Sequence, residues 1–78
     1  MPTLLKEGPF RFFFYSGDRK EPPHVHVRRD NHTAKFWLNP IELERSGGLR
    51  RSEIRRVERI IKENRTSFLG EWNVRFND

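Results

Sequence analysis

The sequence contains no cysteine, and no apolar run approaches the roughly 20 residues that a membrane-spanning helix requires. The absence of cysteine excludes disulfide bonds and thiolate zinc sites, so the chain must be held together by packing alone. Its first residues also lack the apolar stretch and small-residue cleavage site of a signal peptide. We therefore expect a cytoplasmic protein that does not contact the membrane.

The chain is short for a protein that relies on one hydrophobic core. Its 78 residues predict a single small domain over residues 1–78, near the size at which one core is only marginally sufficient. Seven Phe and two Trp still indicate a buried core, although 35% of the residues are charged. Because a partner can supply additional stability, we expect a complex with another protein or a homodimer.

Most of the net positive charge lies in one segment. Residues 49–65 carry seven Arg or Lys against three Glu, which is four of the five net charges of the chain. Such a segment favours RNA or another nucleic acid, or an acidic protein partner. The alternative is a solvated helix face whose charges are partly paired, for example Glu58 with Lys62. The residues predicted to contact nucleic acid or a partner are Arg51, Arg55, Arg59 and Lys62.

The first half of the chain has the patterns of β-strands separated by turns. Residues 10–15 are almost all aromatic, as in a central strand that is covered on much of both faces. Residues 16–20 form a polar, glycine-containing loop. The other predicted strands are residues 3–6, 24–29 and 33–38, of which the last two form a hairpin.

The second half of the chain predicts one long helix. Residues 41–45 form a short turn or helical piece, and Ser52 is a suitable N-cap for the helix that follows. Gly70 costs about 1 kcal/mol inside a helix, and we expect the helix to continue through it to about Asn73. The apolar stripe at helical spacing consists of Ile54, Val57, Ile61, Phe68 and Trp72. The predicted fold is α+β, an antiparallel β-meander of three to four strands packed against one long C-terminal α-helix.

Two prolines lead into a pair of histidines in the segment Glu21-Pro22-Pro23-His24-Val25-His26-Val27. Prolines lack an amide donor and suit the beginning of an edge or terminal strand. Strand side chains alternate, so His24 and His26 point to one face and the valines point to the core. Pairing with the next strand places Arg28, Lys35 and Trp37 on the same open face. His26 then opposes Lys35 or Trp37, depending on the register.

This face has the groups that metal-independent RNA cleavage requires. One imidazole can remove the 2′-hydroxyl proton and a second group can protonate the leaving 5′-oxygen, which makes His24 and His26 the catalytic candidates. Arg28 or Lys35 can bind the phosphate and stabilise the charge of the transition state. Trp37 can stack on a base. This hypothesis requires no cofactor and no metal.

Two alternatives to catalysis stay open for the histidines. Same-face imidazoles can bind a transition metal, although no spacing here matches a closed zinc motif. The residues that could complete such a ligand set are His32, Asp18, Glu21 and Asp30. Otherwise the histidines are structural, with hydrogen bonds to backbone carbonyls, or lie at a partner interface.

Four segments of the chain stand out together: residues 1–3 (Met-Pro-Thr), 8–15 (Gly-Pro-Phe-Arg-Phe-Phe-Phe-Tyr), 21–27 (given above) and 34–40 (Ala-Lys-Phe-Trp-Leu-Asn-Pro). With them the chain resembles, over essentially its full length, the bacterial family DUF4160, a domain of unknown function. Members are small and often look like one half of a toxin–antitoxin gene pair. The resemblance therefore implies a small, neighbour-encoded, antitoxin-like partner. It also implies that His24 and His26, in the family's Pro-His-x-His core, are important.

The leading hypothesis is a small basic module of a bacterial toxin–antitoxin-like pair, acting on RNA as a metal-independent ribonuclease. The alternative is a non-catalytic module that binds protein or nucleic acid, in which the histidines are structural or interfacial. A metal-binding protein is the third hypothesis.

Overall fold

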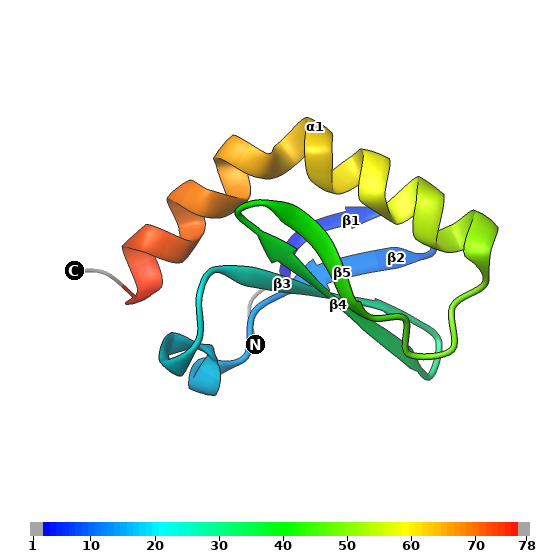
Figure 1. Cartoon of the computed structure of the whole chain (residues 1–78), viewed down its shortest axis with the longest axis horizontal. Coiled ribbons are helices and arrows are strands. Elements are labelled where there is room, and N and C mark those ends of the chain that lie inside the picture. Colours follow the sequence, from blue (N-terminus) through cyan, green and yellow to red (C-terminus); the bar gives the residue numbers. More distant parts are fainter. Residues whose placement is uncertain (1–2, 77–78) are drawn as a thin grey trace.

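Figure 1 shows a computed structural model, which describes residues 3–76, as one antiparallel sheet crossed by one long helix. The five strands lie in the sheet in chain order, so the topology is a simple meander. Met1 and Pro2, which belong to the first segment of the family resemblance, lie outside the described residues. The elements are β1 (Thr3–Glu7), β2 (Phe10–Phe13), η1 (Ser16–Lys20), β3 (His24–Arg29), β4 (His32–Leu38), β5 (Ile41–Arg45) and α1 (Arg51–Phe76). The α+β prediction is confirmed, with five strands instead of three to four.

The additional strand is β5, which the sequence predicted as a turn or helical piece. Only Ile41 of this strand packs against the core, and its other residues are exposed. β5 is an edge strand held by its ladder with β4, where Phe36 pairs with Leu43 and Leu38 with Ile41. Ile41 and Leu43 alternate with Glu42 and Glu44, but an alternation with only two apolar residues is a weak signal for a strand.

The core lies between α1 and one face of the sheet. Phe12 packs on Phe68 with ring centroids 5.6 Å apart, and Phe14 meets Trp72 edge-on at 5.2 Å. The apolar stripe predicted for the helix is confirmed, since its members are buried in or packed against this core. The buried residues that the sheet contributes to this core are Phe10, Phe12, Val25, Val27, Ala34, Phe36 and Leu38.

The helix begins earlier and ends later than predicted. Its first turn is capped by the Glu53 carboxylate, which accepts the Arg50 backbone N–H at 2.9 Å, so Ser52 lies inside the helix. The helix continues through Gly70, as expected, and ends at Phe76. Within residues 3–76, α1 is too polar to serve as a membrane span, and the structure describes no other long helix.

The other face of the sheet is partly covered by η1, which the sequence predicted as a loop. η1 lies at the same end of the molecule as the end of α1 (Figure 1). Arg19 Nη2 donates to the Arg75 carbonyl at 3.5 Å. The prediction of an open face is therefore wrong at His24, His26 and Lys35, which are all buried. The placement of the two prolines is also corrected, because β3 is the central strand and they lie before its ladder.

We expect Gly47→Ala to destabilise the fold by about 2 kcal/mol or more, because Gly47 has φ +62 and an added Cβ would lie 1.8 Å from the Thr33 carbonyl oxygen. Urea unfolding measures this loss. The matched control is Gly70→Ala, where a Cβ meets nothing within 4 Å and the helix gains up to about 1 kcal/mol. Equal stabilities for the two variants would contradict the packing described for Gly47.

Candidate functional site

Strand pairing sets the positions of the two histidines. His26 pairs with Lys35 and with Phe13, and His24 pairs with Trp37. The histidines thus share one face of the sheet with Lys35 and Trp37, as the alternation predicted. The His24 ring lies 5.5 Å from the Trp37 ring and 5.1 Å from the Trp72 ring, which leaves the imidazole with no exposed surface.

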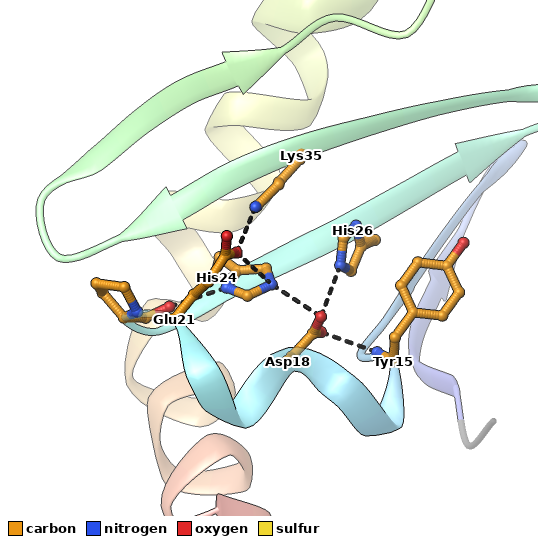
Figure 2. A network of polar contacts seen from close by, with 7 residues as sticks. Tyr15, Asp18, Glu21, His24, His26 and Lys35 are labelled. Atoms are coloured by element: carbon orange, nitrogen blue, oxygen red, sulfur yellow. Dashed lines mark hydrogen bonds and ion pairs between the residues drawn. The ribbon is translucent and has the colours of Figure 1, made fainter.

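The residue that joins the two histidines is Asp18, in η1. Its Oδ1 lies 3.0 Å from His24 Nε2 and 3.3 Å from His26 Nε2. Its Oδ2 accepts the Tyr15 backbone N–H at 2.8 Å. Figure 2 shows Asp18 at the centre of this network, with the two imidazoles converging on its carboxylate. We call Asp18, His24 and His26 the buried triad.

His24 is oriented by the backbone that precedes it. Its Nδ1 lies 2.8 Å from the Pro22 carbonyl oxygen. A carbonyl oxygen can only accept, so Nδ1 must carry the proton and donate. In neutral His24 the Nε2 atom then has a lone pair, although it lies beside an Asp18 carboxylate oxygen. The Pro22 carbonyl thus fixes the imidazole, while the Pro23 carbonyl accepts the Leu38 backbone N–H at 3.0 Å.

His26 is held in an apolar environment. Its ring lies 4.5 Å from the Tyr15 ring and 5.7 Å from the Phe13 ring. Burial lowers the pKa of His26 from its ordinary value of 6.5, and the hydrogen bond to Asp18 opposes this shift. Its Nδ1 has no hydrogen-bond partner among the described residues.

Lys35 is engaged by a carboxylate beside the buried triad. Its Nζ donates to Glu21 Oε1 at 2.5 Å and lies 4.6 Å from the centre of the Trp37 ring. The hydrogen bond from Lys35 holds the pKa of Glu21 below its ordinary value. Lys35 and Trp37 therefore adjoin the histidines as predicted, but the ammonium group already binds an anion within the protein.

The other predicted site residues lie elsewhere. Arg28 is exposed, and its Nε donates to the Asp30 carbonyl at 2.8 Å, so its side chain turns toward the β3–β4 turn. The predicted basic stripe, Arg51, Arg55, Arg59 and Lys62, is exposed along α1. Within it, Lys62 Nζ lies 3.7 Å from Glu58 Oε2, so the predicted pair is present. The structure does not bring these residues to the buried triad.

A pocket of about 600 Å³ lies at the end of the molecule where η1 meets the end of α1. Ser16, Gly17, Arg19 and Lys20 of η1 line it, whereas Asp18 of the same segment belongs to the buried triad. One segment therefore borders both sites. The remaining lining residues are Phe14, Tyr15, Arg75 and Phe76.

Sequence reasoning missed the central role of Asp18 and the whole pocket. Asp18 lies in a polar segment without periodicity, and its only signal was as one of several carboxylates near the histidines. Arg75 lies 56 residues from Arg19, the residue it contacts, so only the packing of α1 brings them together. The sequence has no local pattern for such a contact.

The chain belongs to the family described as a domain of unknown function (DUF4160), whose model matches residues 10–73. The match includes the buried triad, Glu21, Lys35 and η1. No curated protein and no solved structure matches the chain.

We expect the His26 ring to titrate with a midpoint below 6.5, measured by NMR of its ring protons in a buffer that contains a chelator. Well above pH 6.5 the imidazole is neutral in both the folded and the unfolded chain, so it contributes nothing to the pH dependence of stability. As the pH falls below 6.5, the unfolded chain takes up the proton first, and the free energy of unfolding decreases until the folded pKa is passed. A midpoint at or above 6.5 would contradict the apolar environment described for His26.

Proposed function

We propose that this chain is an RNA-binding, toxin-like module of a bacterial two-gene pair, acting in the cytoplasm, and that single-stranded RNA binds in the pocket between η1 and the end of α1. The observation that carries this proposal is the lining of the pocket. Three of its side chains are aromatic and three are cationic, and the lining that residues 3–76 provide includes no acidic residue. Such a module binds RNA without cleaving it, as in the alternative hypothesis, and belongs to a toxin–antitoxin-like pair, as in the leading hypothesis.

The aromatic side chains suit the stacking of a base. Tyr15 is 45% exposed, although its ring also packs on Phe13 and His26. These contacts fix the orientation of the Tyr15 ring, so its exposed face is already positioned for a base. Stacking on an aromatic ring is worth about 1–3 kcal/mol per base and tolerates any sequence. A pocket of about 600 Å³ also lies in the size range of small-ligand sites, which suits one nucleotide of a strand.

The cationic side chains suit a phosphate. Arg75 is half-buried, and its Nε has no hydrogen-bond partner among residues 3–76. A buried N–H without a partner is costly, and a phosphate oxygen would satisfy it. Arg19 and Lys20 add two more positive charges at the rim. The net charge of +5 attracts polyanions over a longer range.

RNA is favoured over an acidic protein because the positive charge surrounds a hollow with aromatic walls. An acidic protein surface would be matched better by exposed arginines on a flat face, such as those of the α1 stripe. We propose that this stripe, or the rim of the pocket, binds the antitoxin-like partner. A homodimer is the other assembly we expect from the small size of the core.

Metal-independent cleavage by His24 and His26 stays a prediction. Both imidazoles are buried beneath η1, with 1% and 6% of the side-chain surface of His24 and His26 exposed. An acid–base role would require η1 to leave the sheet when RNA binds, because a general acid or base must reach the transferred proton directly or through one water. The pocket requires no such movement for binding.

We expect Tyr15→Leu to weaken the binding of a labelled single-stranded RNA by about fivefold or more, measured by fluorescence anisotropy, because the base loses its stacking surface. Arg19→Gln and Arg75→Gln should each weaken binding and reduce the slope of log K against log salt by about 0.7, through loss of one phosphate contact.

The matched control is Arg45→Gln, which removes one exposed charge from β5, away from the pocket. It should change affinity by much less than the pocket variants. If Arg45→Gln and Arg75→Gln weaken binding equally, RNA recognises net charge only. If Arg55→Gln abolishes RNA binding and the pocket variants do not weaken it, the RNA-binding site lies on α1 and not in the pocket.

In bacterial cells, we expect induced expression of the chain to arrest growth, and the double variant Arg19→Gln, Arg75→Gln to relieve the arrest at an equal level of folded protein. Expression of the Arg45→Gln variant should still arrest growth. Growth unaffected by the unaltered chain would contradict the toxin-like part of the proposal, while the anisotropy measurement tests RNA binding independently.

A further inference from the structure

The buried triad brings three ligand-type atoms together on the inner side of η1. One ring nitrogen of His24, one ring nitrogen of His26 and a carboxylate oxygen of Asp18 all lie within 4.8 Å of one another. Nε2 of His24 and Nε2 of His26 lie 3.0 Å and 3.3 Å from Asp18 Oδ1. All three residues are more than nine-tenths buried. Such a concentration of polar atoms must be matched by hydrogen bonds or by a cation.

Hydrogen bonds alone do not complete this cluster. The Pro22 carbonyl requires the proton of neutral His24 on Nδ1, so the lone pair of Nε2 lies next to an oxygen that also has only lone pairs. Although Nε2 is 3.0 Å from Asp18 Oδ1, it makes no hydrogen bond with good geometry to any described residue. The contact therefore requires a positive charge between or beside the two atoms. That charge is either an additional proton or a metal ion.

The spacing matches a metal ion. Imidazole nitrogens and carboxylate oxygens lie about 2.0–2.2 Å from zinc, so two ligands of one ion are about 3.0 Å apart at a right angle and about 3.4 Å apart at the tetrahedral angle. The two distances from Asp18 fall at 3.0 Å and 3.3 Å. Histidine that binds a metal usually donates its other ring N–H to a carbonyl or carboxylate, as His24 does to Pro22.

We infer that Asp18, His24 and His26 bind one divalent transition-metal ion of the zinc class, through Oδ1 of Asp18 and Nε2 of each histidine. Glu21 lies beside this set, with its Oε1 3.8 Å from His24 Nε2, but that oxygen already accepts from Lys35 Nζ, so the fourth position is left to water. The Asp18 carboxylate and the neighbouring Glu21 carboxylate balance the charge of the ion. The ion joins η1 to β3, and this assignment replaces the expectation that the chain needs no metal.

The inference is independent of RNA binding, and its test uses the full chain without RNA. After treatment with chelator, Zn²⁺ should bind with one ion per chain by titration calorimetry and raise the melting temperature. Co²⁺, used as a spectroscopic probe, should give a visible absorption band that Zn²⁺ removes. Asp18→Asn and His26→Gln should weaken Zn²⁺ binding by at least about tenfold, and Glu21→Gln should weaken it less.

The matched control is His32→Ala, because His32 is the third histidine and lies exposed at the beginning of β4, outside the triad. It should leave the stoichiometry and the affinity unchanged. Loss of binding in His32→Ala, or equal affinity in Asp18→Asn and the unaltered chain, would overturn the inference.

A measurement on the unaltered chain covers the case in which the triad variants do not fold. With Co²⁺ bound, the largest paramagnetic shifts in the NMR spectrum should fall on His24, His26 and Asp18, and those of His32 should be small. If the chelated chain binds no Zn²⁺, the inference is wrong. ¹⁵N shifts that show His24 protonated on both ring nitrogens at neutral pH would then identify the positive charge as a proton.

Discussion

The contact between the Asp18 carboxylate and the two imidazoles is the interaction on which the rest of this structure depends. β2 ends at Phe13 and Phe14 still packs on Trp72, but without a tie to the sheet residues 15–23 would form an ordinary surface loop. Asp18 closes η1 against the Tyr15 backbone amide and directs its second oxygen at His24 and His26. A buried carboxylate without a partner is costly, so loss of this contact would destabilise the folded chain.

Once η1 is fixed, it gives the molecule two chemically different sites on its two sides. The inner side is a closed cluster of nitrogen and oxygen ligands, whereas the outer side contributes cations and small residues to the pocket. The end of α1 completes the pocket because Trp72 packs on Phe14 and His24, which brings Arg75 and Phe76 to the same end of the sheet. The aromatic core and the polar cluster thus share residues. A change at His24 is expected to affect both.

The parts of the fold that depend on alternation or helical spacing could be predicted from the sequence. Val25 and Val27 alternate with the histidines, and Phe36 lies between Lys35 and Trp37. This alternation predicted β3 and β4 and placed His26 opposite Lys35 or Trp37, and the structure pairs His26 with Lys35. β5 was predicted as a turn or helical piece although Ile41 and Leu43 alternate with Glu42 and Glu44, because an alternation with only two apolar residues is too short to decide for a strand. The sequence predicted which face of the sheet the histidines share, but it did not predict that η1 covers this face. Asp18 reaches it through turn geometry and long-range packing, which have no period in the sequence.

The most direct test of this account is amide hydrogen exchange at Glu21, whose backbone N–H donates to the Asp18 carbonyl at 3.1 Å and not to its side chain. If the carboxylate holds η1 in place, Asp18→Ala should accelerate exchange at Glu21 by at least about tenfold, as expected for a segment that opens locally, while the amides of β3 and β4 keep their protection. Unchanged exchange at Glu21 in a folded Asp18→Ala variant would show that η1 is held by other contacts and would contradict the account.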